Sequence, residues 1–339
     1  MTVGSLSTLG ATEHSRNSDL IFGRHCLFIV GAPRSGTTWL QMMIAAHPNV
    51  CSTVEQTIFR QYIAPWVEAY EREAAWMKRE GYGHGLPFLW DEPDFCGFIR
   101  EFIERVYARI LATNPEATHI LDKHPDNCHH VDLIDRMVPG ARFIHIIRDG
   151  RDVATSIMAA SREMNFGPPN IHGAATVWKA CLQGARQASK FKGRYLEVRY
   201  EDLKASCFDV MKPVFEFCGL PTTDEQVAGI VRECEFQKLK ERRASAAGDN
   251  EAPEAHYRKG KVGSWQEELS QYESYLFEKL AGALLRELGY AGPYWWARSR
   301  LEQSTLPTRF MFRTVFRTFR SLPRCVYRHV RDGIKRPNP

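Results

Sequence analysis

The strongest constraint on the fold is an apolar run that leads into a glycine-containing loop and then into a helical stretch. Residues 26–30 read CLFIV, residues 31–36 read GAPRSG, and a helix is expected from Thr37 to Ala46. A buried strand followed at once by such a loop and a helix is typical of α/β proteins with a parallel sheet. Because the N–H groups of the loop and of the helix N-terminus point outward, this segment suits phosphate binding.

The loop departs at one position from the pattern G-x-x-x-x-G-K-[ST] that binds nucleoside triphosphates. Gly31, Gly36 and Thr38 fit, but Thr37 stands where the pattern has the lysine that reaches the β- and γ-phosphates. The strong positive charge in the loop is Arg34, three residues upstream. The loop is therefore expected to bind a phosphate donor other than ATP held in the usual way.

The rest of the chain alternates short apolar runs with helical patterns, as in an α/β domain. The expected strands are Cys26–Val30, Val50–Thr53, His119–Leu121, Arg142–Ile147 and Arg194–Val198. The expected helices are Thr37–Ala46, a long one within 56–80, Cys96–Leu111, Val131–Met137, Asp152–Ala160, Ala174–Phe191, Cys207–Cys218 and Leu269–Leu288, with a polar loop over 240–263. The sequence predicts a P-loop-type, three-layer α/β/α domain with a mainly parallel central sheet, followed by a basic helical C-terminal tail.

Composition narrows the class of protein. Hydrophobic residues make up 44% and charged residues 25%, which are ordinary values for a soluble globular chain. The nine cysteines form no C-x-x-C pair, which favours reduced thiols and a cytoplasmic location over a disulfide framework or a zinc site. Residues 1–20 lack the apolar run of a signal peptide, and no stretch has the roughly eighteen apolar residues of a membrane span. His129, His130 and His145 lack a spacing that gathers three ligands, so no metal is expected.

A second group of charged residues follows another expected strand. Arg148 comes directly after that strand, and Ser156 lies on the helix beyond it. Groups just past the carboxyl ends of parallel strands line the ligand crevice, so Arg148 and Ser156 can face one anion. The alternative is a surface cluster in which Asp149 or Asp152 caps the helix.

A third group is the basic loop RKGKVGSW over residues 258–265, which suits closure over an anion or is ordinary solvated surface. Taken together, the groups resemble the motifs of sulfotransferases that use 3′-phosphoadenosine 5′-phosphosulfate (PAPS). GAPRSGTTW at 31–39, Arg148 with Ser156, YEDL at 200–203 and R-K-G-x-x-G-x-W from 258 occur in that family's order, over about residues 24–290. The arginine in the loop and the wording RSGTT…AHPNV look more like tyrosylprotein sulfotransferases and bacterial relatives than like cytosolic members, most of which have lysine there.

The resemblance implies a role for each matching residue. The residues that would hold the 5′-phosphosulfate are Arg34, Ser35, Gly36, Thr37 and Thr38. Those that would bind the 3′-phosphate are Arg148, Ser156, Arg258, Lys259 and Gly260. Trp39 would lie against the adenine and Tyr200 close to the nucleotide. The implied co-substrate is PAPS, without a metal, in a domain over 23–293 between a polar segment at 1–22 and a basic tail at 294–339.

Two residues compete for the role of catalytic base. Cytosolic sulfotransferases carry a histidine two residues after a lysine, whereas here His124 follows Lys123 at once and Pro125 takes the second position. Successive strand residues point to opposite faces, so Lys123 and His124 are not expected to face the site together if the strand reaches them. Glu55, 21 residues beyond Arg34, has the spacing of the glutamate base of the tyrosylprotein enzymes, although a glutamate that only caps the next helix is the other reading. The preferred assignment is Glu55 as base and Lys123 as the cation facing the phosphosulfate, with His124 as the alternative base.

The C-terminal tail is strongly basic. From Trp296 to Pro339 there are eleven lysines and arginines and two acidic residues, whereas the rest of the chain has 34 basic and 38 acidic residues. Basic and aromatic residues recur there at helical spacing, which suits an anionic membrane surface or an acidic partner through residues 300–339, or a terminal helix packed on its own domain. Nucleic acid is not expected as a partner, because no recognition module accompanies the charge.

The leading interpretation is transfer of a sulfuryl group from PAPS to a hydroxyl of a small molecule, lipid or carbohydrate. The sequence does not name this acceptor; twelve aromatic rings between residues 56 and 118 would line its pocket or pack in the core. Two alternatives stay open at this point. They are a P-loop phosphotransferase or NTPase, and a non-catalytic sulfotransferase-like binding protein.

Overall fold

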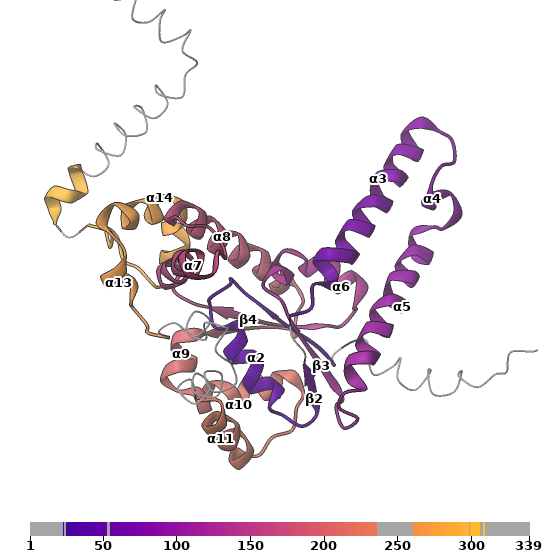
Figure 1. Ribbon diagram of the computed structural model, residues 1–339, viewed down its shortest axis with the longest axis horizontal. Coiled ribbons are helices and arrows are strands. Elements are labelled where there is room, and N and C mark those ends of the chain that lie inside the picture. The colour runs from indigo at the N-terminus through magenta and orange to yellow at the C-terminus, as the bar shows by residue number, and fades with distance from the viewer. Residues whose placement is uncertain are drawn as a thin grey trace, which may run out of the picture. The chain divides into compact units, whose positions relative to one another are not determined.

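The computed structural model describes residues 23, 25–52, 55–235, 260–297, 299–305 and 308. Its centre is a five-stranded sheet, in which neighbouring strands pair in parallel in the order β2-β3-β1-β4-β5 (Figure 1). The strands are β1 (Cys26–Val30), β2 (Val50–Ser52), β3 (His119–Lys123), β4 (Arg142–Ile147) and β5 (Tyr195–Arg199). The predicted parallel α/β sheet is confirmed, and the glycine loop follows its middle strand.

Helices connect the strands. Those of the first part of the chain are α2 (Thr37–Ala45), η1 (Phe59–Ile63), α3 (Ala64–Glu80), α4 (Leu86–Leu89), α5 (Glu92–Leu111), η2 (Pro125–His129), α6 (Val131–Met137), α7 (Gly150–Met164), α8 (Ile171–Ala185), η3 (Arg186–Lys190), α9 (Tyr200–Ala205), α10 (Cys207–Cys218) and α11 (Asp224–Glu233). They are followed by α13 (Trp265–Glu268) and α14 (Gln271–Glu287). Most lie within a few residues of the predicted helices.

Both faces of the sheet are covered, because side chains of both orientations along the strands are apolar. On one face, Leu27 and Ile29 of β1 pack with residues of α2, α10 and α11. On the other face, the ring of Phe28 lies 5.8 Å from the rings of Phe143 and Phe59, measured between centroids. Figure 1 shows α2, α10 and α11 on one side of the sheet and α7 and α8 on the other. The arrangement is the predicted three-layer α/β/α fold.

Helices α3 and α5 form a two-helix arm that extends away from the sheet, with α4 between them (Figure 1). Stacking of Tyr70 on Phe95, with centroids 4.2 Å apart, joins the two long helices. Several rings that the sequence offered for an acceptor pocket lie on this arm and are exposed, among them Phe88 at 66% and Tyr82 at 58%. Others, including Tyr70, Phe95 and Tyr107, are core residues. The arm therefore accounts for many of the rings without an acceptor pocket.

The chain divides into two units, Met1–Trp265 and Gln266–Pro339. In the second, α14 begins at a capping box between Ser270 and Glu273, and the ring of Tyr275 lies 4.8 Å from that of Trp296. The predicted domain limits at 22/23 and 293/294 stay predictions, since residues 1–22 and 309–339 lie outside the described residues. Among the helices that are described, none combines the length and the apolar character needed to cross a bilayer.

Candidate functional site

The loop after β1 owes its shape to three residues with positive φ. Gly31 has φ 149°, and a Cβ there would lie 2.6 Å from the carbonyl oxygen of Ile146. Gly36 has φ 96°, and a Cβ there would lie 2.6 Å from the ring of Tyr200. Arg34 adopts φ 70°, a left-handed conformation that is unfavourable for a residue with a side chain and is found mainly at functional sites. The glycines thus let β4 and Tyr200 come close to the loop.

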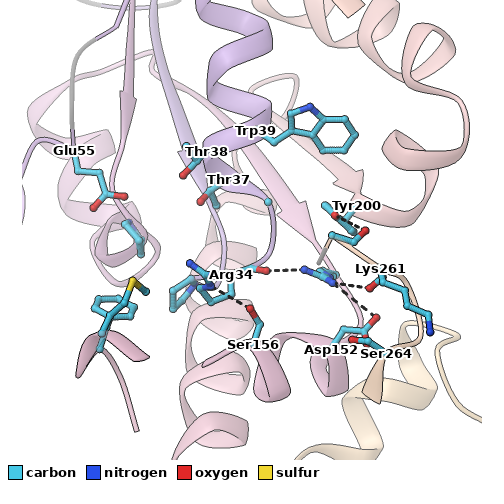
Figure 2. A pocket seen from close by; sticks show the side chains of 17 residues that line it. Arg34, Thr37, Thr38, Trp39, Glu55, Asp152, Ser156, Tyr200, Lys261 and Ser264 are labelled. Atoms are coloured by element: carbon cyan, nitrogen blue, oxygen red, sulfur yellow. Dashed lines mark hydrogen bonds and ion pairs between the residues drawn. The ribbon is translucent and has the colours of Figure 1, made fainter. Parts of the chain in front are cut away.

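The loop opens on a cavity of about 430 Å³ at the N-terminus of α2 (Figure 2). Gly36 is the N-cap and supplies no side chain, and the first turn of α2 has no acidic residue. The N–H groups at this end therefore give the cavity a partial positive charge that attracts anions. The cavity is lined by Pro33, Arg34, Gly36, Thr37, Thr38, Trp39, Glu55, Pro125, Arg148, Asp152, Ser156, Met164, Phe166, Tyr200, Gly260, Lys261 and Ser264.

Arg148 lines this cavity from the turn before α7, and Ser156 lines it from α7 itself. Both contact the loop. Arg34 Nε donates a hydrogen bond to Ser156 Oγ at 3.1 Å, and Arg148 Nη1 donates one to the carbonyl oxygen of Arg34 at 3.0 Å. The two cationic groups predicted from separate parts of the sequence therefore line one cavity. The capping alternative is also realised, since the Asp149 carboxylate accepts from the N–H of Arg151 at the start of α7.

Arg148 lies between the ring of Tyr200 and the basic loop. Its guanidinium lies 4.3 Å from the centroid of the Tyr200 ring, and its Nη2 donates to the carbonyl oxygen of Lys261 at 3.1 Å. Its Nε is buried and has no hydrogen-bond partner among the described residues. A buried unsatisfied N–H is unfavourable, so an anion that accepts from it gains a strong interaction.

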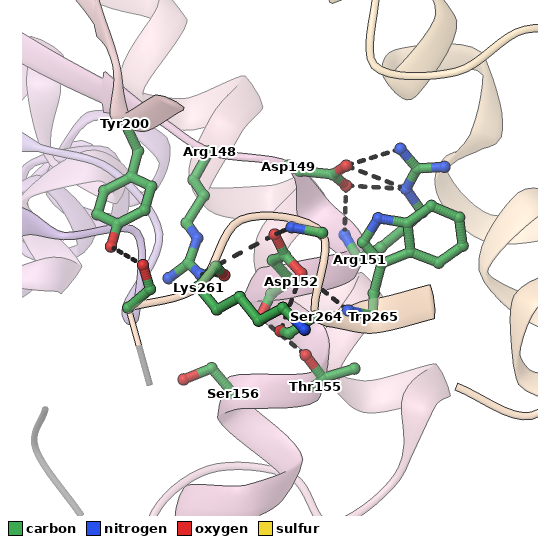
Figure 3. Close-up of polar contacts among 12 residues, drawn as sticks. Arg148, Asp149, Arg151, Asp152, Thr155, Ser156, Tyr200, Lys261, Ser264 and Trp265 are labelled. Atoms are coloured by element: carbon green, nitrogen blue, oxygen red, sulfur yellow. Dashed lines mark hydrogen bonds and ion pairs between the residues drawn. The ribbon is translucent and has the colours of Figure 1, made fainter. Parts of the chain in front are cut away.

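Asp152 fastens the basic loop to the cavity wall (Figure 3). Its carboxylate accepts from the N–H of Gly263 at 2.7 Å, from Ser264 Oγ at 3.1 Å and from the N–H of Trp265 at 3.0 Å. Tyr200 Oη donates to the carbonyl oxygen of Gly260 at 3.2 Å. These contacts hold Gly260 against the cavity, whereas the predicted ligands Arg258 and Lys259 lie outside the described residues.

On the other side of the cavity, Glu55 meets the end of β3. Lys123 Nζ donates to Glu55 Oε1 at 2.5 Å and to Thr38 Oγ1 at 3.2 Å, so one buried ammonium joins the carboxylate to α2. Figure 2 shows the Glu55 carboxylate pointing toward the loop from the side opposite Tyr200. Glu55 is 47% exposed at its side chain, which leaves it open to a ligand.

The condition under which Lys123 and His124 would face opposite sides is not met, because the strand does not reach His124. Strand β3 ends at Lys123, and His124 Nε2 lies 3.9 Å from Glu55 Oε2. His124 is the N-cap of η2, and its Nδ1 accepts from the N–H of Asp126, which places the ring proton on Nε2. Burial lowers the pKa of His124, so the ring is neutral at neutral pH and its Nε2–H faces the carboxylate.

Of the remaining predicted residues that the structure describes, two line the cavity and one does not. Trp39 lines the cavity, and its Nε1 donates to the carbonyl oxygen of Cys234 at 2.8 Å. Thr37 lines it as well. Ser35 is 1% exposed and does not line the cavity, so its side chain packs behind the loop.

Seven lining residues are not among the predicted site residues: Pro33, Pro125, Asp152, Met164, Phe166, Lys261 and Ser264. Asp152 was considered as a helix cap, and Lys261 belonged to the basic run without a role of its own. Met164 ends α7 and Phe166 follows it, and neither belongs to a motif. A carboxylate four residues after Arg148 was the available signal for Asp152, because i and i+4 side chains share a helix face.

Comparisons with known proteins find similarity to sulfotransferases. The chain is 24% identical to protein-tyrosine sulfotransferase A of Caenorhabditis elegans over 207 residues, 59% of this chain and 51% of the relative. It is 28% identical to flavonol 3-sulfotransferase of Flaveria bidentis over 294 residues, 78% of this chain and 82% of the relative. It spans 31% to 54% of the first four relatives it matches.

A solved structure has the same fold. The mouse sulfotransferase SULT7A1 complexed with PAP superposes with a TM-score of 0.50 at 18% identity, over 84% of this chain and 94% of that one. A family model described as "Sulfotransferase family" matches residues 27–224, more than half of the chain. The chain therefore belongs to the sulfotransferase family.

Proposed function

We propose that this protein transfers the sulfuryl group of PAPS to a hydroxyl of an acceptor. The observation that carries the proposal is one cavity with two sets of anion-binding groups, the loop with the α2 N-terminus and the pair Arg148 and Ser156. A nucleotide with phosphates at both its 5′ and 3′ positions needs two such sets. The 3′-phosphate is also what distinguishes PAPS from ATP.

The proposed contacts follow the cavity from one side to the other. The N–H groups of Gly36, Thr37 and Thr38 bind the 5′-phosphosulfate, with Ser35 shaping the loop behind them. Arg148 Nε and Ser156 Oγ bind the 3′-phosphate, and Trp39 and Tyr200 lie against the nucleoside. Gly260 closes this side, together with Arg258 and Lys259.

Sulfuryl transfer then requires Glu55, Lys123 and Arg34. The acceptor oxygen attacks sulfur as its proton passes to Glu55 Oε2, and the bond from sulfur to the phosphate oxygen breaks. The products are the sulfated acceptor and 3′-phosphoadenosine 5′-phosphate (PAP). Lys123 holds Glu55 through Oε1, and Lys123 and Arg34 stabilise negative charge on the leaving phosphate. We propose that sulfuryl transfer needs no metal ion, as the sequence predicts.

The acceptor side of the cavity is partly apolar. Pro125, Met164 and Phe166 line the same cavity as Glu55. We therefore propose an acceptor that has an apolar or aromatic body beside its hydroxyl, as in a small molecule or a lipid. A screen of such alcohols and of sugars with labelled PAPS identifies the class; turnover of sugars alone contradicts this choice.

Binding calorimetry with PAP and with adenosine 5′-phosphate tests the nucleotide site, because the two differ only in the 3′-phosphate. The chain is expected to bind PAP more tightly, and Arg148→Met to weaken PAP by about 10- to 100-fold, the effect of one charged hydrogen bond, without weakening adenosine 5′-phosphate. Arg105→Ala, on the exposed face of α5, is the control and should change neither. Equal affinity for the two nucleotides would overturn the proposal.

Titration with ATP and Mg²⁺ distinguishes a P-loop phosphotransferase or NTPase from a sulfotransferase. A phosphotransferase or NTPase prefers ATP, whereas Thr37 at the lysine position predicts weak binding of ATP relative to PAP. A non-catalytic binding protein binds PAP but transfers no sulfuryl group to any acceptor. The Glu55–Lys123 pair beside the loop argues for catalysis.

We also propose a cytoplasmic location, because nine dispersed cysteines suit a reducing compartment. Residues 300–339 would add peripheral contact with an anionic membrane or an acidic partner through their basic residues. Flotation of the chain with anionic vesicles, with and without residues 300–339, tests the contact. Equal recovery of the two would exclude the membrane.

A further inference from the structure

Three side chains of the types that serve as metal ligands lie close together outside the cavity. Cys128 and His129 lie on η2, and Cys181 lies on α8. The ligand atoms of the three lie within 4.8 Å of one another, and Cys181 Sγ is 3.7 Å from His129 Nε2. None of the three lines the cavity. The spacing of histidines in the sequence does not show this group, because Cys181 comes from a distant helix.

The packing of α8 on η2 is built around Gly184, one helical turn from Cys181. A Cβ on Gly184 would lie 2.4 Å from the carbonyl oxygen of Cys128 and 3.5 Å from His129 Nδ1. A side chain at this position would push the two segments apart. The absence of one therefore brings the sulfur of α8 within reach of both ligands of η2.

The donor set and its spacing fit zinc. Zinc binds thiolate at about 2.3 Å and imidazole at about 2.0–2.1 Å in tetrahedral geometry, which puts sulfur and nitrogen about 3.6 Å apart. The observed Cys181–His129 separation of 3.7 Å is close to this value. The cysteines are 1% and 3% exposed, whereas His129 is exposed, so water can complete the coordination on that side.

We propose that Cys128, His129 and Cys181 bind one Zn²⁺, with water as the fourth ligand. The thiols bind as thiolates, and their protons pass to the solvent. The ion would fasten η2 to α8. Because His124 is the N-cap of η2 and Lys123 ends the strand before it, this site would support the Glu55 side of the cavity without taking part in transfer.

Cobalt is the probe for this site, because Co²⁺ takes the same ligands and is coloured. The metal-free full chain, kept reduced, is titrated with Co²⁺ and then with Zn²⁺. We expect one equivalent of Co²⁺ to give a thiolate-to-cobalt charge-transfer band and the visible bands of tetrahedral cobalt, and Zn²⁺ to abolish both. Absence of the charge-transfer band would overturn the proposal.

Variants locate the ligands. Cys181→Ser, which leaves Cys128 as the one thiolate of the proposed site, should reduce the intensity of the charge-transfer band, and His129→Gln should weaken Co²⁺ binding by at least about tenfold, the lower limit for loss of even an outer partner. His129 is exposed, so its variant tests the site even where Cys181→Ser fails to fold. Cys207→Ser, whose sulfur instead contacts Met43, is the matched control and should bind like the unmodified chain. A band of unchanged intensity in Cys181→Ser, or an affinity that His129→Gln leaves unchanged, would place the metal elsewhere and refute the site.

Discussion

Glu55 has two oxygens with different surroundings, and this asymmetry defines its proposed role. Oε1 accepts from Lys123 at 2.5 Å, while Oε2 lies 3.9 Å from His124. A base held by one oxygen can take a proton on the other without turning away. The separation of 3.9 Å between His124 Nε2 and Oε2 is too long for a hydrogen bond, so the oxygen proposed to take the proton is not held by the histidine.

Glu55→Gln is expected to lower kcat by about 10²- to 10⁴-fold, the usual contribution of a general base, and to leave the affinity for PAP unchanged. Glutamine keeps the size of the side chain and an acceptor for Lys123 but takes no proton at neutral pH. Turnover with labelled PAPS and calorimetry with PAP give the two quantities. Full activity of this variant, combined with a large loss in His124→Gln, would transfer the role of base to His124.

A side chain at Gly36 would be unfavourable for two reasons, the positive φ of the backbone and the nearby ring of Tyr200. The two contributions to stability can be measured separately. Gly36→Ala is expected to reduce PAP affinity by more than tenfold and to lower the free energy of unfolding by about 1–3 kcal/mol, since a Cβ would meet the Tyr200 ring at 2.6 Å. Gly81 has φ 78° but open space around it, so Gly81→Ala measures the backbone term alone. Equal effects of the two substitutions in urea denaturation would show that Tyr200 yields without resistance.

For single residues, the sequence predicts which side chains lie at the cavity better than it predicts which way a side chain points. Motif spacing was enough to place Arg34, Arg148 and Glu55 around one cavity. For Lys123 and His124 the outcome depended on where β3 ends, because the alternation of strand side chains applies to Lys123 but not to the residue after the strand.

At the scale of the elements, the buried carboxylate of Asp152 holds the loop at 260–265 through three hydrogen bonds. Asp152→Asn is expected to weaken PAP binding by about tenfold or more, because Nδ2 would replace one carboxylate oxygen and present N–H to a backbone N–H, either that of Gly263 or that of Trp265. Calorimetry with PAP measures the loss. Asp132→Asn, in the first turn of α6 and paired with Lys190 at the surface, is the control. Unchanged affinity in Asp152→Asn would mean that the loop stays in place without this anchor.

Element boundaries were largely predictable, and the misses have physical reasons. The strands Cys26–Val30 and Arg142–Ile147 match the expected limits, because buried parallel strands are continuous apolar runs. Helix α9 was missed because it begins at Tyr200 directly after β5, with no turn to mark it. Helix α11 was missed although Thr223 and Gln226 form a capping box, a signal that the sequence contained.

For the whole molecule, buried titratable groups in the sheet set how stability varies with pH. Burial raises the pKa of Asp122 to about 6, against favourable hydrogen bonds from Asn127 and Tyr107. A raised carboxyl pKa means that the folded state holds its proton longer, so stability falls as the pH rises from about 4 to about 6, by about 3 kcal/mol in total. Asp122→Asn should remove this fall, which urea denaturation at pH 4.5 and pH 7 measures. A variant with the unmodified chain's profile would contradict the assignment.

Two buried histidines act in the opposite direction. Burial lowers the pKa of His119 to about 4, aided by His25, and lowers that of His145 to about 3, aided by Arg186. Both are below the unfolded value near 6.5, so the unfolded chain binds more protons and stability is lost as the pH falls from about 6.5 toward these values.

At pH 5 the expected loss from this effect is about 2 kcal/mol for each histidine. His145→Gln removes one of the two groups, so the fall in its unfolding free energy between pH 7 and pH 5 should be smaller by that amount. His172→Gln, at an exposed position on α8, should keep the full dependence. Urea denaturation at the two pH values compares the three chains. If His145→Gln loses as much stability as the unmodified chain, buried histidines in the sheet are not what makes this fold sensitive to acid.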